Sequence, residues 1–151
     1  MNNILINTKC GIIEGISEQD HNKFLGIRYG EANRFEVTRE VKAWEGIYSA
    51  KSFGAACIQK RTFSPEKEDS FYYREFRKGI EFNYSEDCQF LNIWTPKTGK
   101  RLPVILYIHG GAFQSGCGNE KPFDGQFYAK KGIIFVTCNY RLGPLGFAVT
   151  E

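Results

Sequence analysis

VILYIHGGAF, residues 104–113, joins a run of five apolar or aromatic residues to a histidine and two glycines. A run of this length, preceded by Pro103 and followed by glycine, predicts a β-strand buried in a sheet. Gly110 and Gly111 lack a Cβ atom, so we expect their backbone to adopt angles barred to other residues and to let a ligand oxygen approach closely. An isolated His-Gly-Gly is equally consistent with a structural turn. The flanking sequence therefore has to decide between a binding loop and a turn.

The sequence that follows predicts a crossover unit. A glycine-rich loop over residues 110–118 leads to a helix over residues 125–131, which ends at Gly132, and then to an apolar run over residues 133–138. Strand, helix and strand in this order give a parallel pair joined by a right-handed connection. In that setting, free backbone N–H groups after the first strand point toward one spot.

The sequence upstream predicts further strands. Residues 89–95 form a strand pattern that ends at Pro96, and a Lys-Thr-Gly-Lys turn leads from it to residues 104–108, so we expect these two strands to form a hairpin. Residues 3–8, 10–16 and 23–27 are short, rich in β-branched or aromatic residues, and separated by glycine or polar turns. These three segments predict an opening β-meander.

Two central segments carry weaker patterns. Residues 44–58 show no sustained period, so we expect irregular structure with at most one helical turn. Residues 60–87 are charged and dense in aromatics, which predicts a compact loop folded onto the body. Within that loop we expect a short helix over residues 71–78, capped by Gly79. No repeat or linker divides the chain.

Composition narrows the function. The chain has 151 residues, 42% of them apolar, and its 20 basic and 17 acidic side chains leave a charge of only +3, which indicates a globular domain and argues against a nucleic-acid partner. Residues 1–9 lack the pattern of an export signal, and no apolar run approaches the ~20 residues that span a bilayer. The five cysteines include no Cys-x-x-Cys pair. We therefore expect a cytoplasmic protein without membrane contact, metal or cofactor.

Several segments, spread over nearly the whole chain, resemble the type-B carboxylesterases, the family that includes bacterial para-nitrobenzyl esterases and cholinesterases. Each match is weak alone, whereas their order and spacing together are specific. The matching segments are FLGIRY (24–29), RF (34–35), Trp44, FG (53–54) with Cys57 and Gln59, SEDC (85–88), LNIWTP (91–96), the loop at His109, NYRLG (139–143) and GF (146–147).

The resemblance implies the fold and the chemistry. It implies the N-terminal portion of an α/β-hydrolase, a single incomplete domain over residues 1–151 with a mixed sheet, from an enzyme that hydrolyses small carboxylic esters with a serine nucleophile. By the same resemblance, the amides of Gly111 and Ala112 are oxyanion donors and Gly110 is the turn that aims them. Loss of one such donor in an enzyme costs about 3 to 4 kcal/mol of transition-state stabilisation. His109 matches no family base, and we expect it to order its own loop through hydrogen bonds.

The rest of the family's machinery has no match. The chain contains no Gly-x-Ser-x-Gly, the motif that carries the nucleophile; the nearest sequence, residues 50–54, lacks the first glycine. In the family, the acid and the histidine base follow the serine, which places all three beyond residue 151. We therefore expect the chain alone to be inactive. We also expect an exposed sheet edge that associates with a second copy or with the remainder of the hydrolase domain.

The resemblance also implies two structural pairs. Cys57 and Cys88 match cysteines that form a disulfide in exported relatives, and we expect them reduced in a cytoplasm. Arg34 and Glu86 match a buried ion pair, so loss of one partner would leave a buried, unpaired charge. Arg28 stands where the family usually has proline, which puts the rim of the pocket in doubt.

Two other interpretations stay open. Residues 64–67 have the Ser-x-x-Lys form and residues 97–99 read Lys-Thr-Gly, as in penicillin-recognising enzymes, although both lie in polar turn sequence beside proline. The second is a non-catalytic binding module or a subunit of a split protein, because this fold also serves proteins without a catalytic serine. The residue at the serine elbow of the whole protein would decide the second case.

Overall fold

The computed structural model describes residues 2–148 and is built around one mixed sheet of seven strands. Six strands follow one another across the sheet in the order β1 (Asn2–Thr8), β2 (Gly11–Ser17), β3 (His21–Arg28), β9 (Phe90–Pro96), β11 (Ile134–Cys138) and β10 (Val104–Ile108). The seventh, β6 (Ile47–Ser49), pairs with β2 beside that path. Two further sheets have two strands each. The smaller sheets pair β4 (Gly30–Glu31) with β5 (Arg39–Glu40), and β7 (Ala56–Cys57) with β8 (Tyr84–Ser85).

The predicted opening meander is confirmed. Strands β1 (Asn2–Thr8), β2 (Gly11–Ser17) and β3 (His21–Arg28) pair in sequence, each antiparallel to the one before. The expectation of irregular structure over residues 44–58 is wrong in part, because β6 (Ile47–Ser49) and β7 lie in this segment and β6 runs parallel to β2. Three residues are too few to show a period of two, so this strand depends on its partner rather than on its own pattern.

The predicted hairpin is wrong. Strand β9 (Phe90–Pro96) is antiparallel to both β3 and β11 (Ile134–Cys138), and β11 lies between β9 and β10 (Val104–Ile108). Adjacent strands lie about 4.8 Å apart, so the seven residues 97–103 are long enough to step over one intervening strand. The parallel pairing of β10 with β11, predicted from the crossover unit, is confirmed.

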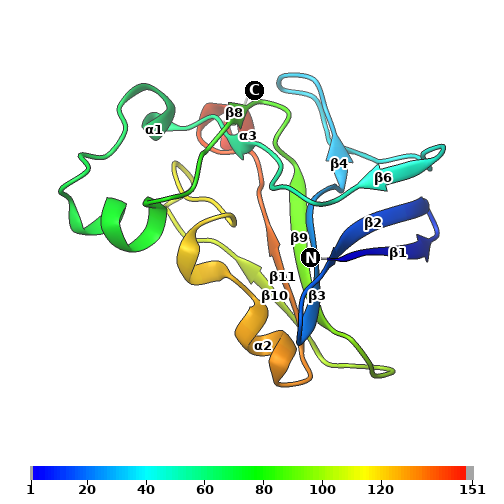
Figure 1. Ribbon diagram of the computed structural model, residues 1–151. Coiled ribbons are helices and arrows are strands. Elements are labelled where there is room, and N and C mark those ends of the chain that lie inside the picture. The colour runs from blue at the N-terminus through cyan, green and yellow to red at the C-terminus, as the bar shows by residue number, and fades with distance from the viewer. Residues whose placement is uncertain (1, 149–151) are drawn as a thin grey trace.

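Helix α2 (Gln126–Lys130), expected over residues 125–131, lies against β3, β9 and β11 (Figure 1). Ala129 on the helix packs on Leu25, Trp94 and Phe135 of those strands, and Trp94 is only 1% exposed. The neighbouring ring of Tyr128 stacks on Phe135 with ring centroids 4.5 Å apart. This cluster is the core on one side of the sheet and holds the crossover in place.

The other side of the sheet is concave and apolar. A groove of about 790 Å³ runs along it, lined by residues that include Ile13, Phe24, Ile93 and Ile134. The register of β10 with β11 places Val104, Leu106 and Ile108 on the same side as Ile134. These three side chains are 57% to 62% exposed, so the prediction that β10 is buried is wrong. The reason is position, because β10 is the outermost strand and no strand among residues 2–148 pairs with its outer edge.

Residues 60–87 form the predicted compact loop, which we call the aromatic loop. It contains α1 (Lys60–Phe63) and the π-helical turn η1 (Tyr73–Arg77), where a short helix was expected, with Gly79 following at a φ of +83°. Tyr72 stacks on Phe76 with centroids 4.6 Å apart, and Phe76 contacts Phe123 in the 3-10 turn η2 (Lys121–Phe123). The aromatic loop is therefore packed on the body through its rings.

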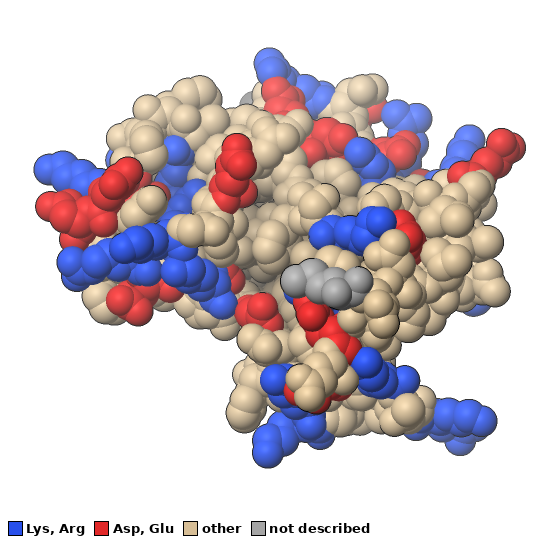
Figure 2. Space-filling model, in the orientation of Figure 1, with Lys and Arg blue, Asp and Glu red and all other residues tan. Residues whose placement is uncertain are grey.

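Helix α3 (Pro144–Phe147) ends the described part of the chain. Within residues 2–148, every helix is too short or too polar to cross a bilayer. On the face drawn in Figure 2, acidic and basic side chains lie next to one another rather than in separate fields.

Candidate functional site

The loop that follows β10, residues 109–118, has an unusual backbone. We call it the glycine loop. Gly111, Ala112 and Phe113 have φ values of +131°, +52° and +62°. The left-handed region is unfavourable for residues with a Cβ, at about 1 to 3 kcal/mol each, and such conformations gather at functional sites. Gly110 has no positive φ, so the expectation of a special backbone at that residue is wrong. The unusual conformation begins one residue later.

Local packing explains why position 111 is glycine. A Cβ added to Gly111 would lie 1.8 Å from the carbonyl oxygen of Ser115, a contact that no side chain tolerates. A Cβ added to Gly110 meets nothing within 4 Å. The requirement for glycine therefore differs sharply between these two neighbouring positions.

In the glycine loop, the carbonyl oxygens of Gly111 and Phe113 accept hydrogen bonds, whereas two amides have no acceptor among the described residues. The carbonyl oxygen of Gly111 accepts hydrogen bonds from the amides of Gln114 at 3.0 Å and Ser115 at 3.1 Å, and that of Phe113 accepts one from Gly143 at 2.7 Å. Among residues 2–148, no group accepts a hydrogen bond from the amide of Gly111 or Ala112, and both residues are exposed. The two amides are thus unpaired donors at the end of β10, suited to bind negative charge.

His109 lies at the start of the glycine loop and is 3% exposed. Its Nδ1 is 2.9 Å from the carbonyl oxygen of Gly110, and its ring stacks on Tyr140 with centroids 4.4 Å apart. The Tyr140 hydroxyl donates to the carbonyl oxygen of His109 at 2.5 Å. Burial lowers the pKa of His109, so the ring is neutral near pH 7. These contacts support the prediction that His109 orders the loop.

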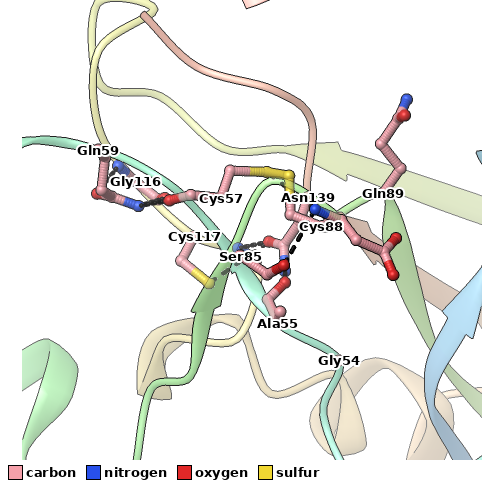
Figure 3. Close-up of a disulfide and its surroundings, with 12 residues drawn as sticks. Gly54, Ala55, Cys57, Gln59, Ser85, Cys88, Gln89, Gly116, Cys117 and Asn139 are labelled. Atoms are coloured by element: carbon pink, nitrogen blue, oxygen red, sulfur yellow. Dashed lines mark hydrogen bonds between the residues drawn. A yellow bond between two sulfur atoms is a disulfide. The ribbon is translucent and has the colours of Figure 1, made fainter. Parts of the chain in front are cut away.

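Two amide side chains hold the far end of the glycine loop, as Figure 3 shows. Gln59 pairs with Gly116, accepting from its amide at 3.0 Å and donating to its carbonyl at 2.9 Å. Asn139 accepts from the amide of Gly118 at 2.7 Å and donates to the carbonyl of Ala55 at 3.2 Å. Neither role was predicted from the sequence, because a contact across 57 positions, as between Gln59 and Gly116, leaves no local pattern.

Cys57 and Cys88 are joined in a disulfide, with Cα atoms 4.9 Å apart (Figure 3). The expectation of reduced thiols is wrong for this structure. The reason is geometric, because parallel pairing of β7 with β8 holds the two ends of the aromatic loop side by side, within the range a disulfide bridges. Cys10, Cys117 and Cys138 are free, and burial raises the pKa of Cys117 to about 12, so this thiol is inert.

The predicted ion pair forms, but it is not buried. The guanidinium Nε of Arg34 donates to Glu86 Oε2 at 2.9 Å, while the two side chains are 63% and 36% exposed. The pair lies at the surface because the segment from residue 33 to 37 is itself exposed. The guanidinium of Arg34 lowers the pKa of Glu86 through this contact. Arg28, at the position where the family usually has proline, pairs with Asp87 at 2.7 Å and lies over the ring of Phe90.

A cluster of charges that the sequence did not predict joins the aromatic loop to the body. Arg61 pairs with Glu66, and Arg77 lies 3.6 Å from the same carboxylate. The hydroxyl of Tyr72 donates to the carboxylate of Glu120, which is 3% exposed, and its oxygen lies 2.8 Å and 2.9 Å from the two carboxylate oxygens. Burial raises the pKa of Glu120. The sequence did not predict this cluster, because its charged residues are far apart in the chain and follow no motif.

The penicillin-type arrangement is not present. Ser64 is exposed at the end of α1, and the Lys-Thr-Gly sequence lies in the turn after β9 rather than on a strand. That class places Lys-Thr-Gly on a strand, so this alternative is wrong.

A mixed sheet with a strand, glycine loop, helix and strand in succession is the architecture of an α/β-hydrolase. The chain belongs to the carboxylesterase family, whose model matches residues 2–151. The para-nitrobenzyl esterase of Bacillus subtilis is 37% identical over 97% of this chain, and the acetylcholinesterase of Danio rerio is 32% identical over 95% of it. A solved thermophilic PNB esterase superposes with a TM-score of 0.81 at 34% identity over 97% of the chain.

The chain spans only part of these relatives. It covers 29% of the length of the para-nitrobenzyl esterase, 24% of the acetylcholinesterase and 29% of the solved thermophilic PNB esterase. The resemblance of fold noted from the sequence is confirmed, and so is the family.

Proposed function

We propose that this chain supplies the oxyanion-hole loop of a carboxylic ester hydrolase that uses a serine nucleophile. The amides of Gly111 and Ala112 are the donors that stabilise the negatively charged oxygen of the tetrahedral intermediate. Gly110 is the turn that aims these two amides, and His109 orders the loop through its contacts with Gly110 and Tyr140. The substrate of the whole enzyme is a small carboxylic ester, and no cofactor takes part.

The single observation behind the proposal is the pair of unpaired, exposed amides at Gly111 and Ala112. Donors held in place before the reaction stabilise a developing oxyanion without reorganisation, and this stabilisation contributes more to catalysis than any other effect in many acyl-transfer enzymes. The strained φ values at Ala112 and Phe113 fit such a loop, because strain is maintained where function needs it.

Residues 1–151 carry no Gly-x-Ser-x-Gly sequence, so we propose that this chain alone does not hydrolyse esters. Ser52 and Ser64 are both exposed, and neither stands in a nucleophile motif. A fluorophosphonate probe that reacts with activated serines would therefore leave both unmodified. Stoichiometric labelling of either serine would overturn the assignment of roles.

The proposal is tested in a chimera. Residues 2–148 replace the matched segment of the Bacillus subtilis para-nitrobenzyl esterase, which is 37% identical to this chain. We expect the folded chimera to hydrolyse a para-nitrophenyl ester, whereas the isolated chain does so only at the background rate. A folded chimera without activity, beside an active parent esterase, would contradict the proposal.

A binding role for β10 is the second candidate. The outer edge of β10 is unpaired among the described residues, and its side chains Val104, Leu106 and Ile108 are exposed. An apolar edge of this kind recruits another strand. We propose that it associates with a second copy or with the remainder of the hydrolase domain.

The cytoplasmic location stays a prediction. The disulfide between Cys57 and Cys88 weighs against it, because disulfides persist mainly in oxidising compartments.

A further inference from the structure

The glycine loop folds back on itself, so that residues near its end contact residues at its start. Gly116 has a φ of +114°, and a Cβ added there would lie 2.3 Å from the carbonyl oxygen of Gly110 and 2.4 Å from His109 Nδ1. The neighbouring amide of Ser115 donates to the carbonyl oxygen of Gly111 at 3.1 Å. The end of the glycine loop is therefore in direct contact with the backbone that leads to the two unpaired amides.

Gln59 holds this end of the loop from outside it, as Figure 3 shows. Its side chain accepts from the amide of Gly116 at 3.0 Å and donates to the carbonyl oxygen of the same residue at 2.9 Å. The same Nε2 also donates to the carbonyl oxygen of Cys57 at 3.1 Å. An amide side chain has one acceptor oxygen and two N–H donors, so all of them are used. Gln59 is 5% exposed, and loss of its side-chain amide would leave buried backbone groups unpaired.

The Cys57 end of this arrangement is fixed by the fold. Cys57 is 2% exposed, lies in β7, which pairs with β8, and is joined to Cys88. Gln59 is only two residues further along the chain, so its side chain reaches Gly116 from a backbone that is held in place. The position of Gly116 therefore depends on a segment 57 positions away in the sequence as well as on the loop itself.

We propose that Gln59 is a positioning residue for the oxyanion donors Gly111 and Ala112. Its hydrogen bonds reach neither amide; it acts by fixing Gly116, whose contact with Gly110 fixes the backbone that presents the two amides. Glutamine suits this position because one end of its side chain offers an acceptor and two donors, whereas ionised glutamate and methionine offer no donor. The inference rests on the proposed function and adds to it a residue outside the glycine loop.

The first test measures the loop in the chain as it is. Gln59→Met keeps the length of the side chain and removes its amide, so we expect the backbone amide resonances of Gly111 and Ala112 to shift in NMR spectra. Gln89→Met is the matched control, because Gln89 is 8% exposed and its side chain donates to Thr38 at 2.8 Å, away from the glycine loop. We expect the same two resonances to stay in place in the control.

Unchanged resonances of Gly111 and Ala112 in folded Gln59→Met, or equal shifts in the two variants, would overturn the proposal. This readout does not depend on ester hydrolysis. If Gln59→Met does not fold, Gln59→Glu gives the same comparison, because it keeps the volume and the acceptor and loses the donors.

The second test measures catalysis in the chimeric esterase. Misplaced oxyanion donors lose stabilisation of the transition state and leave binding of the ester in its ground state almost unchanged. We therefore expect Gln59→Met to lower kcat by about 10- to 100-fold with KM within about threefold of wild type, and Gln89→Met to change neither. An unchanged kcat, or a rise in KM alone, would contradict a positioning role.

Gly111→Ala in the same chimera separates this inference from the proposed function. If Gly111→Ala loses its rate while Gln59→Met keeps it, the oxyanion donors are correctly assigned and the role of Gln59 is wrong. If Gly111→Ala keeps its rate, the assignment of the donors is wrong, and the catalytic role of Gln59 is wrong with it.

Discussion

At the scale of single residues, Gly111 differs from its neighbour Gly110 in both conformation and space. Gly111 has a φ of +131° and no room for a Cβ, whereas Gly110 has neither restriction. A side chain at Gly111 must therefore displace the carbonyl of Ser115, and with it the backbone that presents the amide of Ala112.

We predict that Gly111→Ala in the chimeric esterase lowers kcat/KM by about 100-fold or more, the loss expected when one oxyanion donor is displaced. Gly110→Ala, where the added Cβ meets nothing within 4 Å, is the matched control and leaves the rate within about threefold of wild type. Steady-state kinetics with a para-nitrophenyl ester measures both. A Gly111→Ala variant with a rate within about threefold of wild type would show that the backbone conformation at this position has no part in catalysis.

Protonation of His109 makes the folded protein less stable at low pH. Burial lowers its folded-state pKa below the ordinary value of 6.5, so its contribution to stability is present above pH 6.5 and is lost as the pH falls through the folded pKa. We expect the urea midpoint to drop on acidification and to drop less in His109→Phe. The comparison isolates this residue, because groups such as Glu120 titrate in both proteins. If the urea midpoint falls equally with pH in the two proteins, His109 does not titrate in a buried site.

At the scale of elements, the disulfide closes the aromatic loop between residues separated by 31 positions. Loop-entropy arguments give such a crosslink about 3 to 4 kcal/mol of stability. We predict that alkylation of the unfolded, unreduced protein modifies three cysteines, Cys10, Cys117 and Cys138, and that mass spectrometry shows all five modified after reduction. Reduction also lowers the thermal midpoint. Five modified cysteines without reductant would show that the bond is absent in solution.

The elements that the sequence predicted are those with a pattern of their own. The meander, α2 and β11 have clear periodicity or glycine stops, and each was located within a residue or two. The hairpin of β9 with β10 was wrong because neighbours along the chain are not always neighbours in a sheet, and no local signal reports the insertion of β11. Strand β6 was missed because three residues carry no period.

The candidate site likewise has residues that the sequence predicted and residues that it did not. Its glycine loop and His109 were identifiable from a contiguous motif and from resemblance. Resemblance also named the two structural pairs, but Cys57 and Cys88 were expected reduced and are joined, and Arg34 and Glu86 were expected buried and are exposed. Other parts depend on contacts between distant segments. They are the charged cluster around Glu120 and the hydrogen bonds that Gln59, Asn139 and Tyr140 make to the glycine loop. These contacts form only in the folded chain, because the partners come from segments far apart in the sequence.

At the scale of the whole molecule, the sheet ends in β10 with an edge unpaired among residues 2–148 and an apolar side open to solvent. Exposed edges of this kind template pairing with other chains. We predict that the protein self-associates as its concentration rises, observable by size-exclusion chromatography with light scattering. Leu106→Lys, which places a charge on this edge, restores the monomer, whereas Leu5→Lys on the opposite edge strand β1 is the matched control and does not. A wild-type protein that stays monomeric at high concentration would contradict this prediction.

The groove on the concave side of the sheet extends this apolar surface. Ile134 lines the groove and is paired with Val104 of β10, so the groove and the exposed side of β10 adjoin at these residues. We propose the remainder of a hydrolase domain as the occupant of this surface, since the chain spans 29% of the length of the para-nitrobenzyl esterase.

The most direct test of the central claim is a crystal structure of the chimeric esterase inhibited by a phosphonate bound to its catalytic serine. The phosphonyl oxygen stands in for the oxyanion of the tetrahedral intermediate. Our account predicts that this oxygen lies about 2.7 to 3.1 Å from the amide nitrogens of both Gly111 and Ala112. A phosphonyl oxygen bound elsewhere, with these two amides turned away from it, would contradict the account.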